Sequence, residues 1–109
     1  MRIWLIGCDD AAGRAIVQLA KNPNIELTVT SAQAHPKAVA QGLIEEVDQV
    51  VRVSHININD LARRIRPDLI LIDPGEFARD FARISAGITL SEELTREIAA
   101  TSDYPCLIL

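Results

Sequence analysis

Residues Arg2–Gly7 read RIWLIG, and Ala11–Lys21 read AAGRAIVQLAK. The first segment is a continuous apolar run that ends in glycine, which is typical of a strand buried on both faces of a sheet. The second segment places its apolar side chains on one helical face, and Asn22-Pro23-Asn24 ends the helix. A buried strand followed at once by an amphipathic helix is the opening unit of an α/β fold.

The alternation of strand and helix continues along the chain. Further strands are predicted over residues 25–30, 47–53, 69–72 and 106–109, and further helices over 36–44, 60–66, 76–85 and 92–100. We expect Asn57 or Asn59 to cap the helix over 60–66 and Ser91 the helix over 92–100, with Gly87 interrupting the helix before it. Because parallel neighbours need crossovers of fixed hand, the pattern predicts a three-layer α/β/α sandwich around a mainly parallel five-stranded sheet. Two strand orders fit, 3-2-1-4-5 as in dinucleotide-binding folds and 2-1-3-4-5 as in flavodoxin-like folds.

The composition is that of one small globular domain. The 109 residues are 49% apolar and 24% charged, so we expect a single domain over residues 1–109. A net charge of −4 and an aromatic content of 4% disfavour nucleic-acid binding. No apolar run is long enough to span a membrane, and because Met1 leads directly into a strand-like segment we expect no signal peptide. We therefore expect a cytoplasmic protein without nucleic-acid or membrane partners, in which Cys8 and Cys106 are buried free thiols.

The strand order decides where a ligand would bind. In open α/β sheets, ligands bind beyond the carboxyl ends of the strands, where the strand order reverses. In the order 3-2-1-4-5 this crevice lies between the first and fourth strands, whose loops cover residues 7–13 and 73–76. Three carboxylates, those of Asp9, Asp10 and Asp73, are then expected to approach one another at the mouth of the crevice.

The first loop is a degenerate phosphate-binding motif. Gly7 and Gly13 keep the outer glycines of the spacing GxxGxxG, but Asp10 stands where the middle glycine belongs. At the end of the second strand, Ser31 offers a weaker hydrogen bond to a ribose than an acidic residue would. The candidate cofactor-binding residues are those of the two loops together with this serine: Gly7, Cys8, Asp9, Asp10, Ala11, Gly13, Ser31, Asp73 and Pro74.

The span from Ile3 to Phe77 resembles the nucleotide-binding half of Rossmann domains. The matching features are RIWLIG with GCDDAAGRA, LAKNPNIELTV, EEVDQVVRV and NDLARRIRPDLILIDPGEF. The resemblance is to NAD(P)-binding domains of saccharopine-dehydrogenase-like oxidoreductases and to the N-terminal domains that precede ATP-grasp modules. It implies a Rossmann-like fold of order 3-2-1-4-5, with NAD(P) or an adenine nucleotide as the cofactor. No catalytic residue carries over, because no second domain supplies the chemistry.

A rival resemblance is to the receiver domains of response regulators. Cys8-Asp9-Asp10 is similar to their acidic pair, and Pro67–Asp73 (PDLILID) to their phospho-acceptor strand. The resemblance implies that Asp73 accepts phosphate while Asp9 and Asp10, with Asp73, bind Mg²⁺. Residues 33–59 contain a helix and a strand that receivers lack. No Ser or Thr follows CLIL, and the strand that carries the receiver lysine is absent.

The simplest alternative is that these residues are structural. Asp9 and Asp10 then cap the first helix, residues 73–75 form a turn, and the chain is a structural or interaction module. His35 and His55 are expected at the surface. The apolar strand 106–109 needs cover on its second face, either from a second copy in a homo-oligomer or from the remainder of a larger protein. Our main expectation is a small ligand-binding, nucleotide-binding or regulatory domain that is not catalytic alone.

Overall fold

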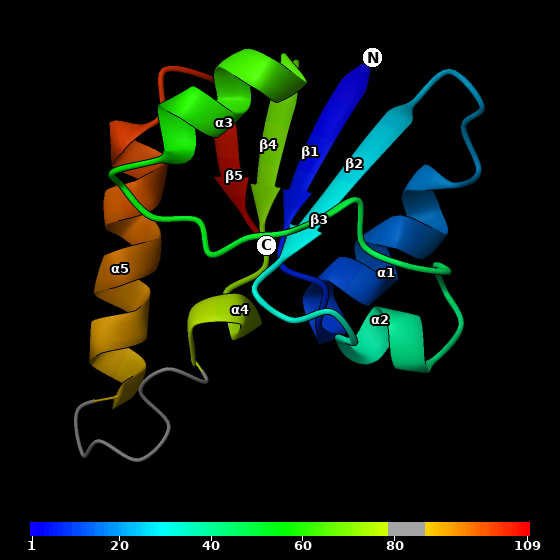
Figure 1. Ribbon diagram of the computed structural model, residues 1–109, viewed down its shortest axis with the longest axis horizontal. Helices are drawn as coiled ribbons and strands as arrows, with labels where there is room; N and C mark the ends of the chain where they lie inside the picture. Colours follow the sequence, from blue (N-terminus) through cyan, green and yellow to red (C-terminus); the bar gives the residue numbers. More distant parts are fainter. Residues whose placement is uncertain (79–86) are drawn as a thin grey trace.

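The computed structural model describes residues 1–78 and 87–109. Within these ranges, five parallel strands form one sheet in the order β3-β2-β1-β4-β5 (Figure 1). The strands are β1 (Arg2–Ile6), β2 (Glu26–Ser31), β3 (Gln49–Val50), β4 (Leu69–Ile72) and β5 (Cys106–Ile108). The predicted α/β/α fold is confirmed, and the sheet has the order 3-2-1-4-5 rather than the flavodoxin-like order.

β1 lies at the centre of the sheet, because both of its edges are paired. Residues Arg2–Ile6 pair with β2, and Ile3–Ile6 pair with β4. The last four side chains of β1 are buried. The indole N–H of Trp4 donates a hydrogen bond of 2.9 Å to the hydroxyl of Thr30 on β2, so the largest side chain of the strand is satisfied without water. The strand that opens the sequence is therefore buried on both faces, as predicted.

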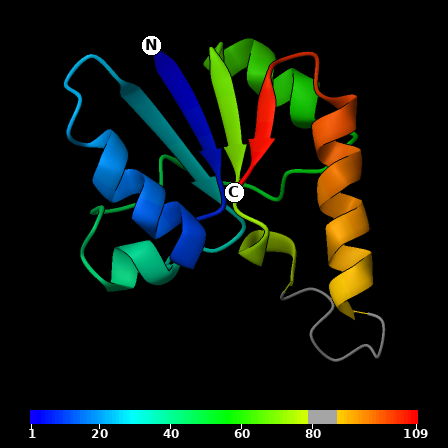
Figure 2. The same ribbon diagram turned by 180° about the vertical axis from the view of Figure 1, so that it is seen from behind.

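The helices lie on the two faces of the sheet in the order that right-handed crossovers require. The elements α1 (Asp10–Leu19) and α2 (Lys37–Ala40) lie on one face, which the chain covers while it moves from β1 to β3 (Figures 1 and 2). The chain then returns across the sheet, and α3 (Ile58–Ile65), α4 (Gly75–Ala78) and α5 (Gly87–Thr101) lie on the opposite face. The reversal of direction between β3 and β4 places the switch point beside β1.

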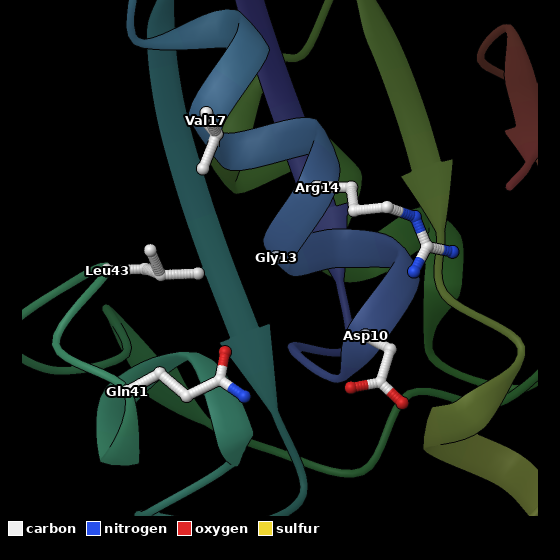
Figure 3. A pocket seen from close by; sticks show the side chains of 6 residues that line it. All are labelled: Asp10, Gly13, Arg14, Val17, Gln41 and Leu43. Carbon is white, nitrogen blue, oxygen red and sulfur yellow. The ribbon is translucent and has the colours of Figure 1, made fainter.

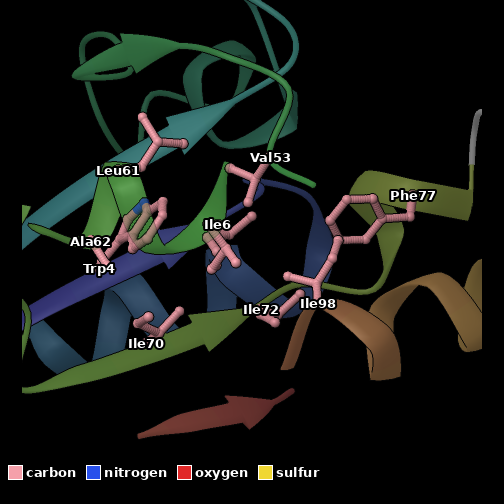
Figure 4. Packing of buried hydrophobic residues seen from close by; sticks show 10 residues of the cluster. Trp4, Ile6, Val53, Leu61, Ala62, Ile70, Ile72, Phe77 and Ile98 are labelled. Carbon is pink, nitrogen blue, oxygen red and sulfur yellow. The ribbon is translucent and has the colours of Figure 1, made fainter. Parts of the chain in front are cut away.

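Each face of the sheet carries its own hydrophobic core. Alternate residues of one strand contribute to opposite cores, since side chains alternate across a strand. On the α3 side the core contains Trp4 and Ile6 of β1 with residues of β4 and three helices (Figure 4). On the α1 side it contains Ile3 and Leu5 of the same strand, with Val29 of β2 and residues of α1 and α2. β1 therefore holds both layers together.

Two predicted elements are shorter than expected, and local hydrogen bonds explain why. The helix expected over 36–44 ends early because Gly42 adopts a φ of +77° and the Leu43 amide donates to the Ala38 carbonyl, a Schellman ending. The strand expected over 47–53 is reduced to β3. Next to it, the carboxylate of Asp48 accepts a hydrogen bond of 2.7 Å from the Val29 amide. A side chain thus replaces the main-chain partner that a longer strand would supply.

The helix ends near the C-terminal half also differ from the prediction. Ser91 does not cap a helix, because α5 already begins at Gly87. The expected interruption of the preceding helix at Gly87 concerns residues that lie outside the described ranges. Asn57 stands at the start of α3, but its side chain accepts from the Ser54 amide, and Asn59 contacts Thr101 and Asp103. The expected helix over 76–85 is described only as α4, since the rest of it lies outside the described residues.

β5 forms one edge of the sheet and is covered on one side only. Cys106 packs against the core beneath α5 and is half-buried, which corrects the expectation of a fully buried thiol. Leu107 points to the opposite side and is 56% exposed, while Ile108 and Leu109 are also exposed. The sheet therefore ends in an apolar edge. Among the helices that can be described, none is long and apolar enough to cross a membrane.

Candidate functional site

The candidate site lies at the carboxyl ends of β1, β2 and β4, where the strand order reverses. β1 continues into Gly7, whose amide donates a hydrogen bond of 2.8 Å to the carbonyl of Thr30 at the end of β2. β4 continues into Asp73, whose amide donates an equally short bond to the carbonyl of Ile6. The loops after β1 and β4 are thus fixed side by side, as the order 3-2-1-4-5 requires.

The carboxylate of Asp73 occupies the amino end of α1. The side chain is buried, and its Oδ2 accepts hydrogen bonds from the amides of Asp9, at 3.0 Å, and Ala12, at 2.9 Å. Its Oδ1 accepts from the Gly75 amide at 2.9 Å. The amino end of a helix attracts negative charge, and in dinucleotide-binding folds a pyrophosphate takes this position. Here the chain's own carboxylate takes it.

Asp9 and Asp10 do not cap α1 as the structural alternative expected. Asp9 stands at the N-cap position but makes no side-chain cap hydrogen bond. The amide of Ala12 is instead satisfied by Asp73, a residue far along the chain. Capping from a distant strand ties the helix to β4, which a local cap would not do.

A second carboxylate, that of Glu76, reaches the carboxyl end of β2. Its Oε1 accepts a hydrogen bond of 2.6 Å from the amide of Ala32, and its Oε2 accepts one of 3.4 Å from the hydroxyl of Ser31. Dinucleotide-binding folds place an acidic residue at the end of this strand to bind ribose. The segment after β2 offered no acid, but α4 brings one there.

Two glycines allow these carboxylates to lie so close. Gly7 has a φ of +88°, and a Cβ at this position would lie 2.9 Å from the Cβ of Glu76 and 3.1 Å from that of Asp73. A Cβ at Gly75 would lie 2.9 Å from Oδ2 of Asp9. In a phosphate-binding loop such close approach serves the ligand. In this structure the space above Gly7 is filled by the side chain of Glu76.

Gly13, a predicted cofactor-binding residue, lies where α1 packs against the segment after α2. A Cβ there would lie 3.2 Å from Cδ1 of Leu43, so this glycine lets the segment after α2 pack closely on α1. Beside it lies an open pocket of about 240 Å³ between the two helices (Figure 3). Asp10 lines this pocket and forms an ion pair of 3.1 Å with Lys37 of α2.

The predicted group of three carboxylates is therefore only partly formed. Asp9 and Asp73 lie together, but Asp10 is exposed and engaged with Lys37. The third acid near Cys8 is Glu76 instead of Asp10. Sequence reasoning did not select Glu76 as a site residue. Its position three residues after Asp73, one helical turn along, was the available signal. In the part of the chain that the structure describes, no group of three or more His, Cys, Asp or Glu is arranged to hold a metal ion.

Cys8 lies beneath these acids and is fully buried. Burial raises the pKa of its thiol from 9.0 to about 11, and the negative charges of Asp73, Asp9 and Glu76 contribute in the same direction. Burial also raises the pKa of Cys106 to about 11. Both thiols are free and neutral near pH 7, which is the state of a packing residue and not of a nucleophile.

The remaining candidate residues lie around this centre. Ser31 is buried, and its oxygen also accepts a hydrogen bond of 3.1 Å from the amide of Gln33. Ala11 is partly exposed on the first turn of α1, and Pro74 lines a separate cavity of about 130 Å³ against α5. His35 and His55 are at the surface, as predicted.

Comparison with known proteins supports the fold. No family model matches the chain, and no curated protein matches it. Among solved structures, the crystal structure of a universal stress protein in complex with cAMP is similar, with a TM-score of 0.55 and 18% sequence identity. The alignment covers 99% of this chain and 95% of the other. At this identity the similarity establishes a shared Rossmann-like α/β fold.

The close approach at Gly7 predicts a large difference between two glycine substitutions. Gly7 and Gly42 both have positive φ, but a Cβ at Gly42 meets no atom within 4 Å. We expect Gly42→Ala to lower the free energy of unfolding by about 1 kcal/mol, the cost of the left-handed backbone alone. Gly7→Ala should cost about 3 kcal/mol or more, because the methyl group also collides with Glu76 and Asp73. Urea denaturation measures both, and equal losses would contradict the described packing.

The raised pKa of Cys8 predicts a loss of stability at alkaline pH. In the unfolded chain the thiol ionises near pH 9, whereas in the folded chain it ionises near pH 11. The unfolded state therefore loses its proton first, and the free energy of unfolding falls as the pH rises between these values. The stability advantage of the wild type over Cys8→Ala should shrink by about 1–2 kcal/mol between pH 8 and 10.5. Urea denaturation of both proteins across this range tests it, and a difference independent of pH would contradict it.

Proposed function

We propose that the chain is a small cytoplasmic regulatory domain, spanning residues 1–109, that binds an adenine mononucleotide and does not catalyse a reaction alone. The observation that carries the proposal is the meeting of the Ala32 amide and the Ser31 hydroxyl at the carboxyl end of β2, beside Gly7 at the switch point. Phosphate and ribose oxygens accept hydrogen bonds from the same kind of donors. The free thiols of Cys8 and Cys106 fit a reducing compartment.

The similar structure supports the choice of ligand class. The universal stress protein of that structure was crystallised in complex with cAMP, an adenine nucleotide. Its fold is shared along nearly the whole of this chain. An adenine nucleotide is therefore the first ligand class to examine.

A mononucleotide fits the crevice better than NAD(P). A dinucleotide places its pyrophosphate at the amino end of α1, where Asp73 is buried and accepts three amide hydrogen bonds. Displacing this carboxylate leaves three donors without their partner and is costly. The β2 side is easier to open, because Glu76, which accepts the Ala32 amide there, is only partly buried, whereas Asp73 is buried. We place the ligand on that side.

A receiver-like signalling domain is the second candidate. It is favoured by the position of Asp73 at the end of β4, directly beside Asp9. Two observations weigh against it. Asp73 has both carboxylate oxygens engaged in hydrogen bonds below the surface, and the strand order differs from the flavodoxin-like order of receivers.

We also propose that two copies associate through β5, which makes the chain an interaction module as well. Cys106–Leu109 carries no charged residue, although natural edge strands use charges to prevent pairing. Leu107 is 56% exposed on the side that α5 leaves open. Antiparallel pairing of two β5 strands about a twofold axis brings these identical apolar surfaces together.

Nucleotide binding is tested by NMR titration of the ¹⁵N-labelled chain. AMP should shift the amide resonances of Gly7 and Ala32 with a Kd on the order of 0.1–1 mM, and NAD⁺ should bind more weakly because Asp73 remains in place. Inorganic phosphate alone is the control for a simple anion effect. The absence of shifts at AMP concentrations of about 10 mM would overturn the proposal. Strong shifts around Asp73 with beryllofluoride and Mg²⁺ would favour the receiver alternative.

Association through β5 is tested by light scattering at micromolar concentrations. The wild type should have the mass of a dimer, and Leu107→Lys should have the mass of a monomer, because a charge on the edge strand opposes pairing. Val17→Lys makes the same change at an exposed residue of α1 and should leave the dimer intact. A monomeric wild type, or a dimer that both variants retain, would contradict this interface.

A further inference from the structure

We propose that Glu76 is an internal competitor of the ligand, an autoinhibitory contact that closes the β2 side of the crevice. The inference rests on the proposed function and adds its regulation. The carboxylate of Glu76 accepts the Ala32 amide at 2.6 Å and lies 3.4 Å from the Ser31 hydroxyl. These two donors are the ones that an incoming ribose or phosphate oxygen would use.

The path of the side chain also blocks approach to Gly7. Glu76 starts at α4, beyond β4, and its carboxylate ends beside β2, so the side chain crosses the carboxyl end of β1 between them. A Cβ at Gly7 would lie 2.9 Å from the Cβ of Glu76 and 3.1 Å from its Oε2. The carboxyl end of the central strand is therefore covered by Glu76. A ligand that contacts the backbone of Gly7 must first displace this side chain.

The side chain of Glu76 is less deeply buried than those of its neighbours, which stay in place when it moves. On one side Asp73 is fixed by three amide hydrogen bonds, and on the other Phe77 is buried in the core on the α3 side. Glu76 itself is only partly buried. Rotation of its side chain thus opens the crevice without unfolding α4, and the backbone provides a fixed hinge.

Electrostatic repulsion favours a direct exchange, in which a ligand phosphate replaces the carboxylate of Glu76 at the Ala32 amide. Asp9 and Asp73 already place negative charge around Cys8, and Glu76 adds to it. A phosphate that entered beside all three acids would be repelled. If Glu76 swings out as the phosphate enters, the amide of Ala32 keeps an acceptor and the local charge rises less. The carboxylate of Glu76 therefore accepts the hydrogen bond of the Ala32 amide when no ligand is bound, and it weakens the binding of a ligand that needs the same donor.

The experiment compares AMP binding in the wild type, Glu76→Ala and Glu76→Gln by NMR titration. Glu76→Ala should bind AMP about tenfold more tightly or better, because no internal acceptor competes for the Ala32 amide. In the absence of nucleotide, the Ala32 amide of this variant should exchange its hydrogen faster than in the wild type. Glu76→Gln keeps the shape and one acceptor and should lie between the two. Glu45→Ala removes the same charge at an exposed residue outside the crevice and should bind as the wild type does.

The outcomes separate the inference from the proposed function. Equal AMP affinity in the wild type and both Glu76 variants overturns the inference and leaves the proposed function in place. Weaker binding in Glu76→Ala also overturns it, since the carboxylate would then hold the ligand instead of competing with it. Unchanged exchange at the Ala32 amide counts against the described contact. If AMP binds neither the wild type nor the variants, the proposed function fails, and the inference fails with it.

Discussion

The carboxylate of Asp73 at the amino end of α1 holds the carboxyl edge of the sheet together. Asp73 follows β4, and its carboxylate accepts three amide hydrogen bonds: from Asp9 in the loop after β1, from Ala12 in the first turn of α1, and from Gly75 at the start of α4. Helix α1 depends on this distant acid, because Asp9 makes no side-chain cap of its own. The same interaction places Gly75 against Asp9, and it starts the turn that brings Glu76 over Gly7. One buried negative charge thus organises the entire crevice.

The loop at Gly7 has the geometry of a phosphate-binding loop, but carboxylate side chains of the same chain lie against it. Gly7 has the positive φ and the close contacts that phosphate-binding loops need, but its neighbours are side chains of the same chain. The negative charges of the acids act on Cys8: together with burial, they raise the pKa of its thiol to about 11. The side chain of Asp10 does not join this group of acids, because it forms an ion pair with Lys37. The loop that departs from the phosphate-binding motif is therefore also the loop whose surroundings are filled by carboxylates of the same chain.

The sequence predicted the layers of the fold well and the details of the site only in part. Apolar runs such as Arg2–Gly7 identify buried strands because burial on both faces leaves no other pattern. The strand order 3-2-1-4-5 was favoured only through the resemblance to Rossmann domains, since it depends on which edges meet and not on either strand alone. The length of β3 was overestimated because the Asp48 side chain substitutes for a main-chain acceptor. Glu76 was missed for a similar reason, because its partner Ala32 is distant in the sequence.

The difference between the two edges of the sheet limits how the molecule can assemble. At one edge, β3 has two residues, and the charged side chain of Asp48 lies beside it. At the other edge, β5 presents an apolar surface without charge. If two copies associate through β5 as proposed, the two-residue strand β3 offers little backbone for a further pairing at the other edge, so the assembly would end with two copies and would not extend into a fibre.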